Sequence, residues 1–375
     1  MKSWAIVVGI NIYPQLAMQR PLHGAVADAC DFADWALDPA GGNVAPECLY
    51  FWTYPWPAAA QGRLQDYLAA GPPLWDNVDT GSAAPDQTRA PKALEITTTI
   101  ESVGRAMRGK ALEDGDTETR RVYVFLAGHG IRAKTVDRNE ETCFLAGDFR
   151  PLNSSLAAGL VPCDSFRRAL LSGRFDEAIL FTDCCRSQTA RSTLVAQQVS
   201  DYSGQPTEPC SIAFAAQDSM LAYETTNPPV RGAFSSALMR GLRTHRIGAV
   251  AALHAAPLRQ YVIDNIKDFT TSGQVPNMWF QPDPDGPLIV SGFPAAAAPP
   301  PIGPLIDVSA LVAGTQLILN GGDNKPLPGM APFVVAGPTL QMPPLAPGLY
   351  LIEIADGTGR YSMFKHPSVE PVHVG

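Results

Sequence analysis

The chain has 375 residues, of which 46% are hydrophobic and 17% are charged, and its formal net charge is −8. This length and balance predict a globular protein with a full hydrophobic core and more than one domain, and they exclude a disordered chain. The acidic net charge disfavours nucleic acid as a partner, because a phosphate backbone is bound by clustered Lys and Arg side chains.

The start of the chain predicts neither export nor membrane insertion. MKSWAIVVGINIYP contains only the short apolar run AIVVGI, and no run of about 18 apolar residues occurs later in the sequence. The seven cysteines are scattered and form no CxxC pair, which favours reduced thiols over a disulfide framework or a zinc site. We therefore expect a cytoplasmic protein without membrane association.

The first third of the chain alternates apolar runs with an amphipathic segment. Ala5–Ile10 and Cys48–Tyr54 are predicted to be buried strands, and His23–Leu37 between them is predicted to be a helix. Residues 55–91 are rich in Pro, Ala, Gly and Asp and are interpreted as a loop or an irregular insertion. A further helix is predicted at roughly 95–110.

The same alternation continues to about residue 270. The predicted strands are Arg121–Ala127, Cys143–Ala146, Glu177–Thr182 and Ser211–Ala216, and the predicted helices are Cys163–Leu171, 232–243 and 255–269. Strands that alternate with helices predict an α/β fold with a mostly parallel sheet flanked by helices. Active sites in such folds gather at the carboxyl ends of the strands.

The sequence changes character near residue 293. FPAAAAPPPIGP, residues 293–304, is a Pro/Ala-rich linker of low complexity, and residues 305–375 contain short apolar runs separated by Gly, Pro and Asn. Three of these runs are Thr315–Leu319, Phe333–Val335 and Tyr350–Ile354. We expect one domain at 1–292 and a small all-β, sandwich-like accessory domain at 305–375.

Two of the predicted strands end in residues suited to nucleophilic catalysis. AILFTDCCRSQ carries Cys184 and Cys185 after one strand, and His129 follows another strand between two glycines. A cysteine nucleophile needs a base, because only a few per cent of a free thiol is ionised at neutral pH. It also needs donors for the oxyanion, a role open to the backbone amide of Gly130.

The two adjacent cysteines are distinguished by strand geometry. Side chains alternate between the faces of a strand, so Asp183 and Cys185 are predicted to point to one side and Cys184 to the other. We therefore predict that Cys185 is the nucleophile and that Cys184 packs beneath it as a small hydrophobe. The alternative, that these are buried structural thiols and His129 a core histidine, is weakened by the position of His129 at a strand end.

The order of these motifs resembles the caspase-like cysteine peptidases, especially their metacaspase and bacterial branch. The resemblance covers residues 1–292 and departs at Cys184, where this branch usually has a small residue, and at Ala127, where many members carry serine. The matching segments are Ala5–Tyr13, Leu22-His23-Gly24-Ala25, Asp28-Ala29, Ala127-Gly128-His129-Gly130, Asp183-Cys184-Cys185-Arg186-Ser187, Phe214-Ala215-Ala216-Gln217, Ala222-Tyr223-Glu224 and Gly232-Ala233-Phe234.

This resemblance implies a caspase-like fold and a cysteine endopeptidase. The family pattern places the nucleophile two residues after an acid, which again selects Cys185, with His129 as its catalytic partner. The implied mechanism is a Cys-His dyad that acts through a thioester acyl-enzyme, with Gly130 at the oxyanion.

The resemblance also implies a preference for basic residues. In this branch the acid two residues before the nucleophile, here Asp183, and an acid in an Asn-Asp-Ala-like motif, here Asp28, receive a basic side chain. Glu224 is a third candidate, although for Glu224 and Asp28 an ordinary helix carboxylate is the alternative. A guanidinium satisfies neighbouring carboxylates with paired hydrogen bonds better than an ammonium does, so Arg is expected to be preferred over Lys.

The expected partners are protein or peptide substrates with Arg or Lys, and an upstream activator protein. The polar segment 186–210 is predicted to be an exposed loop, and cleavage after Arg191 is the expected site if the enzyme cuts its own chain. The alternative is a chain that stays intact. No cofactor is expected; some relatives depend on calcium, but the sequence has no EF-hand loop. The competing hypothesis is a catalytically idle scaffold or regulatory binding protein, against which the intact His129 and Cys185 argue.

Overall fold

The computed structural model divides into two compact units, Met1–Gly292 and Phe293–Gly375. No helix in the described part of the chain is long and apolar enough to cross a membrane. The structure describes residues 1–16, 21–71, 75–77, 81–83, 87–99, 103, 119–135, 139–151, 157–172, 175–186, 195–196, 208–225, 228–245, 252–282, 284–290, 304–321, 325–327, 330–343, 345, 348–356, 358, 360–366 and 372–374.

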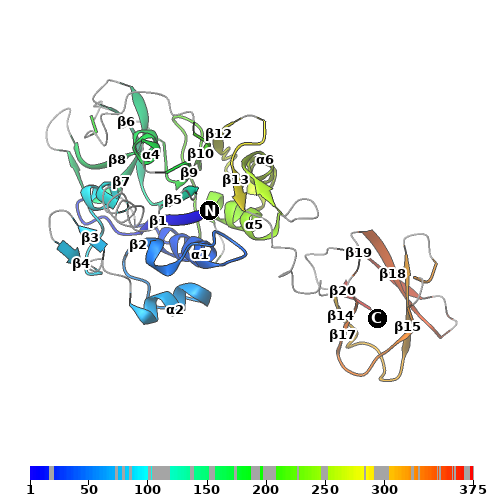
Figure 1. Cartoon of the computed structure of the whole chain (residues 1–375). Coiled ribbons are helices and arrows are strands. Elements are labelled where there is room, and N and C mark those ends of the chain that lie inside the picture. The colour runs from blue at the N-terminus through cyan, green and yellow to red at the C-terminus, as the bar shows by residue number, and fades with distance from the viewer. Residues whose placement is uncertain are drawn as a thin grey trace. The chain divides into compact units, whose positions relative to one another are not determined.

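A six-stranded sheet in the order β12-β10-β9-β5-β1-β2 forms the centre of the first unit (Figure 1). Every neighbouring pair is parallel except β10 and the edge strand β12, which are antiparallel. The strands are β1 (Lys2–Ile10), β2 (Leu49–Tyr54), β5 (Arg120–Ala127), β9 (Glu177–Asp183), β10 (Cys210–Phe214) and β12 (Asn277–Gln281). The predicted mostly parallel sheet is confirmed.

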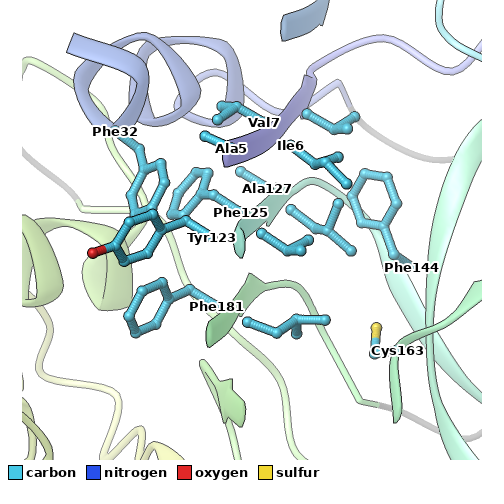
Figure 2. Packing of buried hydrophobic residues seen from close by; sticks show 14 of the residues in the cluster. Ala5, Ile6, Val7, Phe32, Tyr123, Phe125, Ala127, Phe144, Cys163 and Phe181 are labelled. Atoms are coloured by element: carbon cyan, nitrogen blue, oxygen red, sulfur yellow. The ribbon is translucent and has the colours of Figure 1, made fainter. Parts of the chain in front are cut away.

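Helices cover both faces of this sheet. Helix α1 (Ala25–Leu37) packs on β1 and β5, and α4 (Cys163–Leu171) packs on β9. Figure 2 shows Phe32 of α1 on one side of these strands and Cys163, the first residue of α4, on the other. The Phe32 ring stacks on Phe125 of β5 with their centroids 4.6 Å apart. Helices α5 (Ala233–Thr244) and α6 (Ala255–Asn265) follow, with α5 beside α1 and α6 beside α5.

A three-stranded antiparallel sheet begins directly after His129. It consists of β6 (Gly130–Lys134), β7 (Glu140–Pro151) and β8 (Ala157–Pro162) in that order. Only Cys143–Ala146, the apolar centre of β7, was predicted as a strand, because charged residues at both ends of β7 interrupt the hydrophobic pattern.

The interpretation of residues 55–91 as a loop was wrong for part of its length. Helix α2 (Gly62–Ala70) lies within it, because Leu64 and Tyr67 share one helical face and both are buried. Two short strands, β3 (Trp75–Asn77) and β4 (Gly81–Ala83), pair with each other in the same segment. The helix predicted near 95–110 begins at residue 93 and is helical to residue 99, and most of the remainder lies outside the described residues.

The remaining elements of the first unit are short. Strands β11 and β13 pair in an antiparallel manner, and a single 3₁₀ turn precedes β2 and another follows α6. They are η1 (Pro46–Cys48), β11 (Leu253–His254), η2 (Ile266–Asp268) and β13 (Leu288–Val290).

The second unit consists of two small sheets around a separate core. Its core residues come from both sheets, for example Ile306 on β14 and Ile352 on β18, which agrees with the predicted sandwich-like arrangement. The predicted linker at 293–304 lies outside the described residues except for Pro304. One sheet contains β17 (Thr339–Gln341), β14 (Leu305–Asp307) and β20 (Val372–His373), and the other contains β16 (Phe333–Val334), β15 (Gln316–Gly321), β18 (Gly348–Ile354) and β19 (Tyr361–His366).

Candidate active site

The carboxyl ends of β5 and β9 bring the predicted dyad together. Ala127 pairs with Asp183 in the sheet, and the Gly128 N–H donates to the Asp183 carbonyl at 3.0 Å. His129 and Cys185 each lie two residues beyond this pair, so both leave the sheet at the same edge. They line one cavity of about 80 Å³ together with the predicted acids Asp28, Asp183 and Glu224.

Cys185 is the more accessible of the two adjacent cysteines. It is half-buried, and its thiol donates a hydrogen bond to the Ala222 carbonyl at 3.6 Å. Burial raises the pKa of the Cys185 thiol, so this group is neutral at physiological pH and needs a base before it can attack.

Cys184 packs beneath the backbone of Gly130. It is fully buried, and a Cβ added to Gly130 would lie 2.3 Å from the Cys184 sulfur. Burial raises the pKa of this thiol well above its ordinary value. Position and burial both favour the predicted choice of Cys185 as nucleophile, which stays a prediction.

The backbone of His129 is held from two sides. Its N–H donates to the Tyr13 hydroxyl at 2.8 Å, and its carbonyl accepts from the Leu145 N–H at 2.9 Å. The imidazole lies against the Tyr13 ring, with centroids 5.0 Å apart and planes inclined by 46°. Sequence reasoning assigned no role to Tyr13, since nothing in a sequence indicates that a tyrosine contacts a residue 116 positions away.

Gly130, the predicted oxyanion donor, is the first residue of β6. The described lining of the cavity includes Gly128 and His129 but not Gly130. A Cβ at Gly130 would lie 2.7 Å from the Cys185 carbonyl oxygen, so the glycine allows the two chain segments to approach closely. The oxyanion role of the Gly130 amide stays a prediction.

Asp28 is a buried carboxylate that already has a cationic partner. Its Oδ1 accepts from the Arg231 Nε at 2.5 Å and its Oδ2 from the Gly232 N–H at 2.7 Å. Burial raises the pKa of Asp28 to about 7, and nearby Asp183 adds to the rise while Arg231 opposes it. Asp28 is therefore not a solvated helix carboxylate.

Asp183 is bound on one oxygen only. Its Oδ2 accepts from the Ser235 N–H at 3.0 Å and from the Ser235 hydroxyl at 2.6 Å. Among the described residues, Oδ1 has no hydrogen-bond partner. Burial raises the pKa of Asp183 to about 6, against the lowering effect of the two Ser235 bonds.

Glu224 connects the cavity to the start of α1. Its Oε1 accepts from the His23 N–H at 2.7 Å and from the Gly24 N–H at 2.6 Å. Gly24 is the N-cap of α1 and His23 precedes it, so the carboxylate lies at the positive end of this helix. No described residue binds Oε2. Glu224 therefore acts as a helix-start carboxylate, but for α1 and not for a helix of its own. It also lines the cavity.

Arg186 anchors the turn that carries the nucleophile. It is 7% exposed; its Nε donates to the Thr142 hydroxyl at 2.6 Å, and its guanidinium pairs with Asp218 and lies over the Phe214 ring. Its backbone N–H donates to the Met220 carbonyl at 3.0 Å, which joins this turn to the loop before Glu224. Arg191, the predicted cleavage point, lies outside the described residues.

In the described part of the chain, no group of three or more His, Cys, Asp and Glu side chains is arranged to hold a metal ion.

Comparison with known proteins identifies the family. A family model for the caspase domain matches residues 2–281, a range that contains His129 and Cys185. The chain belongs to the caspase family. Over 248 residues it is 29% identical to a probable protease from a Desulfuromonadales bacterium. The aligned region covers 65% of this chain but only 26% of that relative. The match ends at Gln281, the last residue of β12, so the unit Phe293–Gly375 lies beyond it.

Proposed function

We propose that this caspase-family chain is a cysteine endopeptidase that cleaves proteins after basic residues, with Arg preferred over Lys. The observation that carries the proposal is the joint placement of a thiol, an imidazole and three carboxylates around one cavity of about 80 Å³. A nucleophile and a base account for hydrolysis, and the carboxylates account for selection of a cation.

The reaction begins with a neutral thiol, because burial raises the pKa of Cys185. His129 takes the thiol proton as the sulfur attacks the scissile carbonyl carbon, and the Gly130 N–H stabilises the oxyanion. The C–N bond then breaks, and the imidazolium returns its proton to the departing amine, which leaves a thioester on Cys185. His129 next deprotonates a water molecule that hydrolyses the thioester and regenerates the thiol.

The preference for arginine follows from the unpaired carboxylate oxygens. Oδ1 of Asp183 and Oε2 of Glu224 have no partners among the described residues, and both side chains line the cavity. Arg231 compensates part of the negative charge of Asp28, so Asp28 contributes less to the binding of a basic side chain than a free carboxylate would. A planar guanidinium reaches two carboxylates at once, whereas an ammonium presents a single point charge.

The test is a peptide series that differs only in the residue before the scissile bond. Arg, Lys, citrulline and Asp peptides are offered to the wild-type protein and to Cys185→Ala, His129→Ala and Cys184→Ala. We expect cleavage in the order Arg, Lys, citrulline, with no cleavage after Asp, and we expect only Cys184→Ala to keep most of the activity. Activity that survives in Cys185→Ala, or cleavage after Asp, contradicts the proposal; no cleavage of any peptide supports the idle scaffold.

A further inference from the structure

Tyr13 is a buried tyrosine that the proposed chemistry does not use. It follows β1 and is 8% exposed, yet it contacts the loop after β5 that carries the catalytic histidine. Its hydroxyl accepts the His129 N–H at 2.8 Å and its ring packs on the imidazole. Burial raises the pKa of Tyr13 well above its usual range, so the hydroxyl is neutral at physiological pH.

The approach of Tyr13 to this loop requires a glycine. A Cβ added to Gly128 would lie 2.2 Å from the Tyr13 hydroxyl oxygen and 2.9 Å from the Phe144 ring. Any side chain at position 128 would therefore displace the hydroxyl from the His129 amide. The hydrogen bond between Tyr13 and the His129 amide therefore depends on a glycine at position 128.

We propose that Tyr13 is a positioning residue for the general base His129. It acts twice on the same residue, since the hydroxyl fixes the backbone amide and the ring limits rotation of the imidazole. The inference rests on the proposed function of His129. A base has to lie within about 3 Å of the proton that it removes, and a displacement of about 1 Å can cost roughly 100-fold in rate.

The experiment compares Tyr13→Phe with the matched control Tyr67→Phe in the full-length chain. Tyr67 is also buried, at 5% exposure, and its hydroxyl donates to the Leu49 carbonyl at 3.1 Å, outside the cavity. Each variant keeps its ring and loses one buried hydrogen bond with the backbone, so the two are expected to lower the melting temperature to a similar extent. They differ in the partner of the lost bond, which is the His129 N–H for Tyr13 and the Leu49 carbonyl for Tyr67.

Two measurements separate positioning from stability. In Tyr13→Phe we expect kcat for the Arg peptide to fall by about 10- to 100-fold with KM little changed, and in Tyr67→Phe we expect both values to stay near wild type. The second measurement is the rate at which iodoacetamide alkylates Cys185 at neutral pH, followed by mass spectrometry. It needs the base but no peptide, and in Tyr13→Phe it is expected to fall towards the rate of His129→Ala.

The outcomes distinguish the inference from the proposed function. If the wild-type protein cleaves no peptide, the proposed function fails, and the alkylation rates still test whether Tyr13 positions His129. If kcat and the alkylation rate of Tyr13→Phe equal those of the wild-type protein, the inference is overturned. Equal losses of kcat in Tyr13→Phe and Tyr67→Phe overturn it as well, because they show a general effect of stability.

Discussion

At the scale of single residues, the two aspartates of the cavity have different surroundings. Asp28 accepts hydrogen bonds on both oxygens, one of them from Arg231, whereas Asp183 accepts only on Oδ2, and its Oδ1 has no partner in the described part of the chain. Both are buried, so each is costly to ionise without a cation nearby. A basic side chain that enters the cavity supplies that cation, which makes Asp183 the stronger candidate for direct recognition.

The first prediction concerns Asp183→Asn. The amide can still accept a bond from Ser235, but the charge beside the cavity is lost. Discrimination for an Arg peptide over its citrulline counterpart is expected to fall by about 2 kcal/mol or more, measured as the ratio of the two kcat/KM values. The control is Asp268→Asn, which removes an exposed acid paired with Arg240 on the surface. An unchanged ratio in Asp183→Asn would exclude Asp183 from recognition.

The second prediction is the pH dependence of selectivity. The raised pKa values of Asp183, about 6, and Asp28, about 7, mean that these acids take up protons as the pH falls through 7 and 6. The negative charge is then lost, so kcat/KM for the Arg peptide should fall with decreasing pH more steeply than for the citrulline peptide. A ratio of the two that stays constant from about pH 8 to about pH 5 would contradict this assignment.

At the scale of elements, the turn after β9 and the loop between β10 and α5 both contribute residues to the cavity wall. Arg186 joins them, because its guanidinium donates to the Ala216 carbonyl at 3.2 Å and its backbone N–H to the Met220 carbonyl. The Cys185 thiol contacts Ala222 of the same loop. A single buried arginine thus sets the distance between the nucleophile and the residues before Glu224.

The third prediction compares Arg186→Met with Arg167→Met. Arg167 is another buried arginine; it pairs with Asp164, lies over the Trp279 ring and lines no part of the cavity. Both changes remove a buried guanidinium together with its hydrogen bonds, and each is expected to lower the free energy of unfolding by about 1–3 kcal/mol. Only Arg186→Met is expected to lower kcat, by about 10-fold or more. Equal kcat values in the two variants would exclude the anchoring role.

The elements that could be predicted are those with a local pattern. The parallel strands are continuous apolar runs, and α4 begins and ends at the predicted residues Cys163 and Leu171 because its apolar face has clear helical spacing. Helix α2 was missed because Pro, Ala and Gly around it suggested a loop, although Leu64 and Tyr67 already had helical spacing.

The same distinction applies to the candidate site. His129, Cys185 and the acids were predicted as site residues because each lies in a recognisable motif of the chain, and all of them line the cavity. Tyr13 and Arg186 acquire their contacts only when distant segments meet: Tyr13 bonds to residue 129 and Arg186 to residue 142. Such contacts depend on tertiary packing, and no spacing in the sequence encodes them.

At the scale of the whole molecule, the chain contains two separate hydrophobic cores. The core of the first unit includes residues from Trp4 to Val290, and the core of the second includes residues from Ile306 to Val374. Every described residue that lines the cavity belongs to the first unit. The expected activator protein and the cytoplasmic location stay predictions at this scale.

The fourth prediction follows from these separate cores. A unit with its own core is able to fold alone, so residues 1–292 without the second unit should fold and cleave the Arg peptide with the kcat/KM of the full chain. Circular dichroism and peptide kinetics check this, with Cys185→Ala of the shortened chain as the blank. A shortened chain that is folded but inactive would show that catalysis needs the second unit. Equal peptide cleavage combined with slower cleavage of a protein substrate would instead assign the second unit to substrate docking.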